Sequence, residues 1–431
     1  MEDMVSRIML KPKSASPHCR HCSAELDLPF ADLGETPIAN DFIAAEDLHC
    51  IEPRYPLRAF VCRNCRLVQL EDFVRADRVF RADYAYQSSM SSSWLAHAQH
   101  YVEDMIEALK LGSLSRVIEI ASNDGYLLQY FKVAGIPVTG IEPAASVAKI
   151  AREQRGIPTI ETFFGENEAL NLRETIGPAD LIAANNVLAH VPDINDFVAG
   201  FRILLKPNGI ATFEFPHLLN LMKLGQFDTI YHEHFSYLSL TALERIFRKA
   251  GLSVFDAKEL PTHGGSLRLF VCPSEAALAE TDALKGIRGK EKKASLDTDA
   301  PYLAFAEKPR ATKTALLALL GSLKAKGKTI AAYGAPAKGN TLLNYCGIGT
   351  DIIDFTVDRA PSKQGRFLPG SHIPIYGPEA IAARKPDFVL ILPWNLVSEI
   401  TNDLAFIRTW GGRFILPMPS PHLLEEAFYA N

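Results

Sequence analysis

The chain has 431 residues, which is too long for one hydrophobic core, so we expect two to four domains. Hydrophobic residues make up 48% of it and charged residues 22%, both ordinary values for globular domains. The net charge of −5 supplies no positive field, which argues against binding to nucleic acid or to an anionic membrane.

The N-terminal segment has no apolar run long enough for a signal peptide, and no later run reaches the roughly 18 apolar residues of a spanning helix. We therefore expect a cytoplasmic protein. In that reducing compartment the seven cysteines, an odd number, are poor candidates for a disulfide framework. Their spacing is more informative than their number.

Two Cys-x-x-Cys pairs lie in residues 1–75, which we expect to form a small zinc-binding domain. Cys19 and Cys22 are followed, after 39 intervening residues, by Cys62 and Cys65. Four thiolates at this spacing can close tetrahedrally around one Zn²⁺. A redox dithiol is the alternative, but neither pair opens a helix after a strand. Four cysteines leave no position open for water, so the predicted zinc ion is structural.

A central α/β domain is predicted at residues 76–275, with a helical lead-in at 76–111. After the lead-in, apolar strands alternate with helices. This alternation predicts a doubly wound parallel sheet, whose ligands bind at the carboxyl ends of the strands. Strands are predicted within residues 116–125, 138–142, 180–186, 209–216, 252–256 and 265–271.

A helix late in this domain is predicted from Thr241 and Glu244, which have the spacing of a capping box. The stretch TIYHEHFSYLS, residues 229–239, joins the strand at 209–216 to this helix. We therefore place that stretch at the ligand end of the sheet.

The C-terminal residues 276–431 repeat the α/β pattern after a polar, charged stretch at 285–299. A long helix is predicted near residues 302–324. Further strands are predicted at 328–333, 353–357, 387–392 and 413–416. We expect these residues to form a second α/β unit.

The turn after the first strand of the central domain indicates the cofactor. It lacks the G-x-G-x-x-G pattern that admits a pyrophosphate to a helix N-terminus. An acid, Glu119, is followed by small residues, and a second acid, Glu142, ends the next strand 23 positions later. This arrangement suits a ligand with a ribose and a positive charge but no phosphate. S-adenosylmethionine is such a ligand.

Each residue of this predicted cofactor site has an expected role. Glu142 accepts hydrogen bonds from the ribose hydroxyls. Ala121 and Gly125 let the backbone approach the methionine moiety, while Glu119 and Asp124 place negative charge near the sulfonium and amino groups. Asp124 fits a turn residue or a helix cap equally well. Two asparagines at the end of a neighbouring strand face the methyl-transfer zone. The predicted cofactor residues are Glu119, Ala121, Asn123, Gly125, Glu142, Asn185 and Asn186.

Residues 231–237 contain two histidines, one glutamate and two tyrosines. A metal site is one interpretation, because His232 and His234 point to one side of an extended backbone, but a third ligand is missing. A solvated loop is another. Proton transfer is the third, since imidazole titrates near neutral pH and a carboxylate can orient it. Methylation of carbon needs both a base and a stabilised enolate, so dense acid-base groups beside a methyl donor favour carbon.

Taken together, these segments resemble the sugar C-methyltransferases that act on nucleotide-linked 4-keto-deoxyhexoses. The resemblance covers nearly the whole chain. It implies a zinc-binding domain, a class I methyltransferase domain and a C-terminal Rossmann-like domain, with the substrate held between them. It rests on the segments CRHC, CRNC, EIASNDGYLLQYF, GIEPAASVA, ANNVLAHVPDINDFV, YHEHFSYLS, THGGSLRLFV and YGAPAKGNTLLNY.

The resemblance also implies a mechanism. A base removes the proton next to the 4-keto group, usually at C3, and the enolate attacks the methyl group of S-adenosylmethionine with inversion. The family's base is a histidine in a Tyr-x-x-His motif that matches Tyr231 and His234 here. We therefore expect His234 to be the general base, Tyr231 its partner or the stabiliser of the enolate oxygen, and Glu233 a supporting acid.

The substrate contacts are predicted from position. His190 would border the substrate, although a structural role fits it nearly as well. Tyr84 and Tyr86 would cover the sugar or the base, but aromatic packing between domains explains them equally well. Lys338 and Asn340 lie in a strand-to-helix turn that suits an anion such as the nucleotide diphosphate, and a plain tight turn is the alternative.

Other functions stay open at this point. The methyl group could go to C5, or to an oxygen of a sugar or small phenol. A zinc-module RNA methyltransferase needs a basic, aromatic surface, which the negative net charge does not favour. We expect no nucleic-acid or membrane partner, and a monomer or a weak homo-oligomer.

Overall fold

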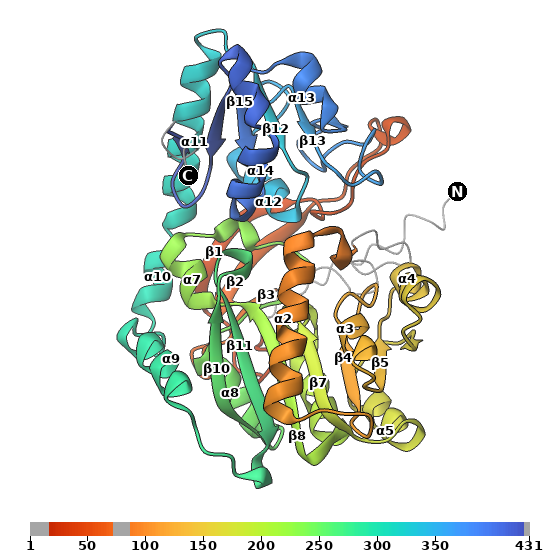
Figure 1. The fold of residues 1–431 in the computed structure, drawn as a ribbon. Helices are drawn as coiled ribbons and strands as arrows, with labels where there is room; N and C mark the ends of the chain where they lie inside the picture. Colours follow the sequence, from red (N-terminus) through yellow and green to blue (C-terminus); the bar gives the residue numbers. More distant parts are fainter. Residues whose placement is uncertain (1–16, 72–86, 426–431) are drawn as a thin grey trace, which may run out of the picture.

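The computed structural model describes residues 17–71 and 87–425, and three β-sheets organise them (Figure 1). Figure 1 shows the C-terminal unit at the top and the central unit at the bottom, with strands β1 and β2 (red) between them. Among the helices of the described residues, none is both long and apolar enough to cross a membrane.

The N-terminal sheet has four strands in the order β1-β2-β3-β9. Strands β1 (Leu28–Thr36), β2 (Tyr55–Val61) and β3 (Val68–Leu70) are antiparallel neighbours. The fourth strand, β9 (Ser236–Tyr237), comes from the central part of the chain and pairs antiparallel with β3. This sheet therefore includes the end of the histidine-rich stretch, a pairing that the sequence did not predict.

The central sheet has seven strands in the order β10-β11-β8-β7-β4-β5-β6. Five of them, β4 to β8, are parallel, and β10 and β11 form an antiparallel hairpin at one edge. The predicted doubly wound sheet is thus confirmed. The strands are β4 (Val117–Ile120), β5 (Val138–Ile141), β6 (Thr159–Ile160), β7 (Ala179–Asn185), β8 (Leu205–Pro216), β10 (Leu252–Leu260) and β11 (Ser266–Pro273).

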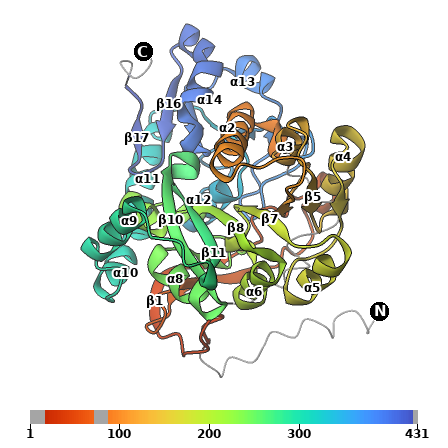
Figure 2. The same cartoon turned by 60° about the horizontal axis from the view of Figure 1, so that its bottom comes forward.

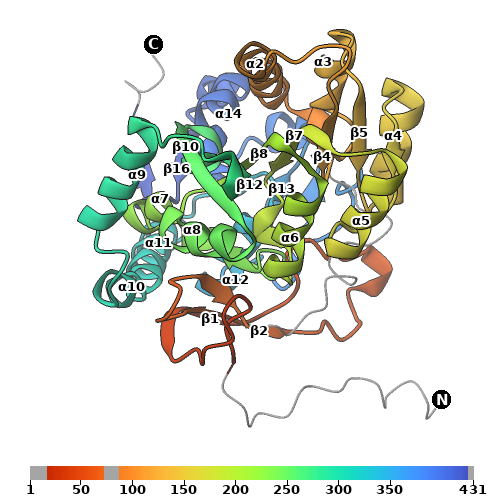
Figure 3. The ribbon, with the colours of Figure 1, turned by 90° about the horizontal axis from the view of Figure 1, so that it is seen from below.

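Helices cover both faces of the central sheet (Figure 3). Val117 and Leu181 pack on one face with α2 and α3, while Ile118 and Ile182 pack on the other with α5, α6 and α8. This alternation follows from the two-residue period of a strand and explains why the strands are apolar on both faces. The helices of this unit are α2 (Ser92–Leu109), α3 (Leu128–Val133), α4 (Ala145–Arg155), α5 (Glu166–Thr175), α6 (Ile194–Leu204), α7 (Leu218–Leu224) and α8 (Leu240–Lys249).

The C-terminal sheet has six strands in the order β14-β13-β12-β15-β16-β17, and all but the last are parallel. Its strands are β12 (Ile330–Tyr333), β13 (Phe355–Val357), β14 (Ile375–Tyr376), β15 (Phe388–Ile391), β16 (Arg413–Leu416) and β17 (His422–Leu423). The helices of this part are α9 (Asp282–Lys293), α10 (Ala300–Phe305), α11 (Lys308–Lys324), α12 (Ala337–Cys346), α13 (Glu379–Arg384) and α14 (Val397–Asp403).

Helices α9 and α10 carry the chain from the central sheet back to the N-terminal strands (Figure 2). Helix α9 packs against β10, and α10 packs against β1. At the second contact the rings of Phe30 and Phe305 stack with their centroids 4.4 Å apart, and both side chains are fully buried. The N-terminal sheet therefore shares one hydrophobic core with α11, α12 and the C-terminal sheet.

Two local predictions need correction. Helix α8 is capped by Ser239, whose hydroxyl accepts the Ala242 N–H at 3.2 Å, and Glu244 binds Arg288 instead of closing a capping box with Thr241. The predicted helix at 302–324 is two helices, because a proline in the first turn begins a second one. The predicted domain boundaries at residues 75 and 275 stay predictions.

Candidate active site

The four predicted zinc ligands lie together. The sulfur atoms of Cys19, Cys22, Cys62 and Cys65 are all within 4.8 Å of one another, and the Cys19–Cys65 and Cys22–Cys62 pairs are 3.5 Å apart. A tetrahedral zinc ion with Zn–S bonds of about 2.3 Å needs sulfur atoms about 3.8 Å apart, so the cluster fits Zn²⁺. Among the described residues it is the one cluster that could hold a metal, so the histidine stretch gains no support as a metal site.

The loop after β4 has a backbone conformation that side chains rarely adopt. Ala121, Asn123 and Gly125 all have positive φ angles, of 58°, 50° and 78°. The Glu142 carboxylate at the end of β5 accepts the N–H of Asn123 at 2.9 Å and of Ala144 at 2.8 Å. Burial raises the pKa of Glu142. This carboxylate fixes the loop and keeps lone pairs for a further donor, as the ribose assignment requires.

Several buried oxygens at this end of the sheet lack a partner in good hydrogen-bond geometry. Both carboxylate oxygens of Glu119 are among them. Burial, with Asp124 and Glu142 nearby, raises the Glu119 pKa well above its usual value, against the effect of a hydrogen bond with Tyr126. Buried polar groups are normally hydrogen-bonded, so such a cluster fits a polar ligand with donors, such as S-adenosylmethionine. The other oxygens belong to Ser122, Asp124, Asn185 and Asn186.

The side chains of Asn123 and Asp124 also hold the lead-in to α2. The 3-10 helix η2 (Ser88–Met90) lies over the loop, where the Ser88 N–H donates to Asn123 Oδ1 at 2.9 Å. The Ser89 hydroxyl donates to Asp124 Oδ2 at 2.5 Å. The side chains of Asn123 and Asp124 therefore fix a covering segment, in addition to any contact with the cofactor.

Tyr231 and His234 form a pair. The Tyr231 hydroxyl lies 2.7 Å from His234 Nε2, and His234 Nδ1 lies 2.8 Å from the Thr229 carbonyl. A carbonyl only accepts, so Nδ1 carries the hydrogen and Nε2 accepts from Tyr231. Burial, together with His190, lowers the pKa of His234 well below its usual value. His234 is therefore a neutral imidazole near neutral pH, with an unprotonated Nε2 that can accept a proton.

His190 joins this pair from the end of β7. Its Nδ1 donates to the Glu233 carbonyl at 2.8 Å, and its ring centroid lies 4.6 Å from that of His234. Burial lowers the pKa of His190 to about 4. Two neutral imidazoles thus lie side by side, four residues beyond Asn186 of the cofactor site.

The two residues between Tyr231 and His234 are directed elsewhere. The Glu233 carboxylate accepts the side-chain amide of Asn40 at 2.7 Å, and burial raises its pKa to about 7. His232 contacts the Pro56 carbonyl at 3.2 Å, and burial lowers its pKa to about 4. Both are buried against the N-terminal part, whereas Tyr231 and His234 are half-buried. Glu233 therefore supports the segment through Asn40.

The predicted substrate contacts differ in their surroundings. Lys338 lies over the Trp394 ring, 4.4 Å from its centroid, and donates to Asn395. Burial lowers the pKa of Lys338 to about 8, although the Asp228 carboxylate acts in the opposite direction. Asn340 is buried, and its amide donates to the Ala39 carbonyl at 2.6 Å. Tyr84 and Tyr86 lie outside the described residues.

Sequence reasoning missed a buried ionic group beneath this site. Arg268 Nη2 donates to Glu214 at 2.5 Å, and His97 Nε2 lies 2.9 Å from the same carboxylate. The hydrogen bonds from His97 and the charge of Arg268 overcome burial and lower the pKa of Glu214 to about 2. The sequence does contain a signal for this group, because a charged residue lies within each of two apolar strands, Glu214 in β8 and Arg268 in β11. The two residues are direct partners across β8 and β11.

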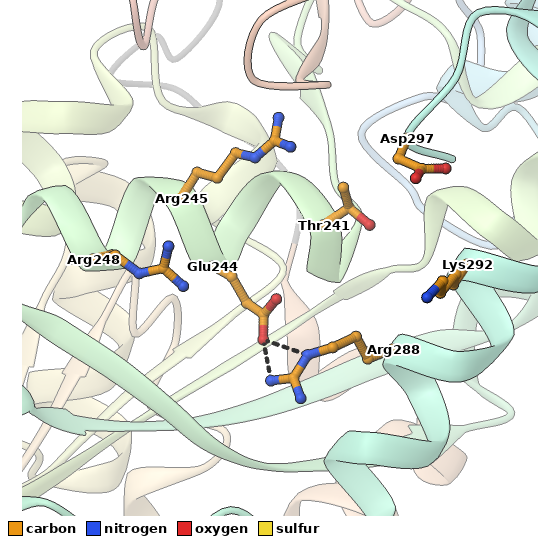
Figure 4. Close-up of a pocket in the computed structure, with 7 residues that line it drawn as sticks. All are labelled: Thr241, Glu244, Arg245, Arg248, Arg288, Lys292 and Asp297. Atoms are coloured by element: carbon orange, nitrogen blue, oxygen red, sulfur yellow. Dashed lines mark hydrogen bonds and ion pairs between the residues drawn. The ribbon is translucent and has the colours of Figure 1, made fainter. Parts of the chain in front are cut away.

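A surface depression lies away from this site, between α8 and α9 (Figure 4). No predicted catalytic, cofactor or substrate residue lines it. Its Arg288 is neutralised by Glu244 at 2.6 Å and by Glu280 at 2.9 Å. It is lined by Thr241, Glu244, Arg245, Arg248, Arg288, Lys292 and Asp297.

Three family models match successive parts of the chain. A zinc binding domain matches residues 19–80, a methyltransferase domain matches 94–257, and a C-methyltransferase C-terminal domain matches 261–419. The C-methyltransferase NovU of Streptomyces niveus is 37% identical over 408 residues, which cover 94% of this chain and 96% of that protein.

Other similarities are partial. A ubiquinone biosynthesis O-methyltransferase of Bordetella avium is 32% identical over 114 residues, or 24% of this chain and 44% of that one. The structure of magnesium protoporphyrin IX methyltransferase from Synechocystis with bound SAH covers 45% of this chain and 92% of that one, with 15% identity and a TM-score of 0.34, too low to support an argument. The three domain matches and the full-length relative place the chain in the family of S-adenosylmethionine-dependent C-methyltransferases with an N-terminal zinc-binding domain.

Proposed function

We propose that this enzyme methylates carbon C3 of a nucleotide-linked 4-keto-deoxy sugar. The observation that carries the proposal is the neutral His234, whose basic Nε2 faces the Tyr231 hydroxyl at the carboxyl end of the central sheet. A C–H group next to a ketone needs such a base, because it loses a proton only when the resulting enolate is stabilised. The full-length C-methyltransferase relative supports carbon as the acceptor.

The pair can take up the proton and stabilise the charges that result, an imidazolium on His234 and a negative enolate oxygen. His234 Nε2 takes the proton from the carbon next to the ketone, and the C–H electron pair forms the enolate. Once protonated, Nε2 becomes a donor to the Tyr231 oxygen. The Tyr231 hydroxyl hydrogen is then free to turn to the enolate oxygen. When bound, S-adenosylmethionine supplies an electrophilic methyl group, which the enolate carbon attacks with inversion.

We further propose how the substrate is held. Lys338, the second residue of α12, would contact the diphosphate. The half-buried His190 would border the sugar. The Asn340 amide is already bound to Ala39, so its predicted contact with substrate stays a prediction. The roles of Tyr84 and Tyr86 also stay predictions, as do the monomeric or weakly oligomeric state and the cytoplasmic location.

Incubation with S-adenosylmethionine and a panel of nucleotide-linked 4-keto-6-deoxy sugars tests the proposal. We expect a mass gain of one methylene for at least one sugar, and NMR of the product should place the new methyl on C3. A methyl on C5 would correct the position only. A methyl on oxygen, or no product from any keto sugar, would contradict the proposal.

A further inference from the structure

We propose that the zinc-binding domain holds both histidine segments of the active site in place, and that Arg20 is the positioning residue that joins them. This inference rests on the proposed function for the roles of His190 and His234. It gives the zinc-binding domain a part in catalysis, beyond its own folding.

The segment after His234 is built into the zinc-binding domain. The Leu70 N–H donates to the Phe235 carbonyl at 3.0 Å, so the contact begins at the residue that follows His234. The pairing continues through β9, where Gln69 lies opposite Ser236 and Val68 opposite Tyr237. The backbone position of His234 is therefore fixed by strand β3, which begins three residues after the last zinc ligand.

Gln69 connects this strand to the zinc ligands. Its side chain is buried, its amide nitrogen lies 3.2 Å from Cys19 Sγ, and its amide oxygen accepts the Arg20 N–H at 2.8 Å. An N–H donor to a metal-bound thiolate orients the ligand and the donor together. Gln69 thus ties the first cysteine pair to strand β3, which holds the catalytic segment.

Arg20 lies between Cys19 and Cys22 and reaches both histidine segments. Its guanidinium donates to the Pro192 carbonyl at 2.8 Å and to the Leu70 carbonyl at 2.9 Å. The same guanidinium lies 5.3 Å from the centroid of the Phe235 ring. Pro192 follows His190 by two residues, and Phe235 follows His234 directly. One side chain therefore spans the distance between the two imidazole segments.

The first cysteine pair is also docked on the segment that follows His190. His21 Nδ1 lies 2.7 Å from Asn195 Oδ1, and the Asn195 amide nitrogen lies 3.2 Å from the Arg20 carbonyl. Asn195 is in the first turn of α6, five residues after His190. The contact of Arg20 with Pro192 is thus part of a wider interface.

The second cysteine pair supplies a matched control. Arg63 follows Cys62 as Arg20 follows Cys19, but it forms ion pairs with Asp27 at 2.8 Å and with Asp299. Its side chain is 47% exposed. Arg63→Met removes the same charged group from the equivalent position of a cysteine pair, and the ion pairs lost are with Asp27 and Asp299, which lie in neither histidine segment.

The first test compares Arg20→Met with Arg63→Met. We expect Arg20→Met to lower kcat roughly 10- to 100-fold, as loss of an orienting partner does at metal sites, with one zinc per chain retained. The Kd for S-adenosylmethionine should stay within twofold in both variants, and Arg63→Met should keep kcat within twofold. Arg20→Lys, with one remaining donor group, should recover part of the rate. A zinc-loaded Arg20→Met with wild-type kcat would overturn the proposal.

The second test needs no substrate. Backbone hydrogen exchange is measured on the zinc-loaded protein and after zinc removal by a chelator. We expect the amides of Leu70 and Tyr237, on the two strands of this pairing, to lose protection, while those of β4 keep theirs. Unchanged protection at Tyr237 in zinc-free protein would overturn the inference. If wild-type enzyme methylates no keto sugar but exchange changes as expected, the proposed substrate fails while the coupling of zinc to this segment stands.

Discussion

The central and C-terminal units share one arrangement, in which a carboxylate accepts two backbone N–H groups, but they differ in the side chains around it. In the central unit, Glu142 after β5 accepts the N–H groups of Asn123 and Ala144. In the C-terminal unit, Asp358 after β13 accepts the N–H groups of Ala335 and Ala360, at 2.7 and 2.8 Å. In both units an acid after the second strand fixes the turn after the first.

The difference lies at the end of the first strand. In the central unit, Glu119 near the end of β4 places two buried carboxylate oxygens beside the turn, near Tyr126, Asp124 and Glu142. The corresponding strand of the C-terminal unit, β12, is Ile-Ala-Ala-Tyr, and within the described residues it has no such oxygen. The two units thus differ in the side chains that their first strands bring to this turn, although the backbone contact is the same.

Replacing the proposed base should have the largest effect. His234→Ala removes the basic Nε2 and should lower methyl transfer roughly 10²- to 10⁴-fold, the usual contribution of a general base. Calorimetry should show that S-adenosylmethionine still binds. His100→Ala, at an exposed histidine of α2, is the control and should keep the wild-type rate. Unchanged turnover in His234→Ala would remove His234 from the mechanism.

The two equivalent acids should respond differently. Glu142→Gln replaces one accepting carboxylate oxygen with an NH₂ donor. The loop N–H groups and the ribose hydroxyls then have one acceptor fewer and no charged one. We expect affinity for S-adenosylmethionine to fall roughly 10- to 100-fold. Asp358→Asn makes the same change in the C-terminal unit and should leave that affinity within twofold. Equal losses in the two variants, measured by calorimetry, would show that the units are not functionally distinct.

In the C-terminal unit, replacement of Lys338 should weaken binding of the nucleotide sugar. Lys338→Met keeps the length of the side chain and removes the charge, so KM for the nucleotide sugar should rise about tenfold, as for one lost charged hydrogen bond. The affinity for S-adenosylmethionine should not change. Lys328→Met is the control, since Lys328 pairs with Asp387 at 3.0 Å on the surface. A Lys338 variant with wild-type KM would exclude a contact between this side chain and the diphosphate.

Acid should destabilise the central unit slightly through His232. In the unfolded chain a histidine has a pKa of about 6.5, and burial lowers the pKa of His232 to about 4. The unfolded state then binds a proton that the folded state does not. The contribution of His232 to the free energy of unfolding is kept above pH 6.5 and decreases as the pH falls, by about 0.8 kcal/mol at pH 6, and His190, whose pKa burial also lowers to about 4, adds a decrease of the same sign. Urea denaturation at pH 8 and pH 6 measures it. His232→Gln should show a smaller decrease than wild type, and an equal decrease would contradict the assignment.

Much of the fold followed from local patterns. Alternating apolar strands and helices predicted the central sheet, and two Cys-x-x-Cys pairs predicted the metal ligands, because these signals lie within short segments. The pairing of Ser236 with Gln69 left no such signal. It joins residues 167 positions apart through backbone groups, which all residues share.

The histidine stretch shows the same limit at a finer scale. Its composition indicated acid-base chemistry, but four consecutive residues divide into two that are half-buried and two that are buried against the N-terminal part. The position of Asn40 beside Glu233 decides this division, and Asn40 comes from a distant part of the chain. Residue type therefore indicates acid-base chemistry, while tertiary contacts decide which of the four side chains stay half-buried.

Exchange of the substrate proton tests the central claim most directly. A nucleotide-linked 4-keto-6-deoxy sugar is incubated in D₂O with enzyme and S-adenosylhomocysteine, so that no methyl group can be transferred, and deuterium at C3 is followed by NMR. The account predicts that wild-type enzyme incorporates one deuterium at C3 and that His234→Ala incorporates none above the uncatalysed rate. Incorporation by His234→Ala at the wild-type rate would contradict it.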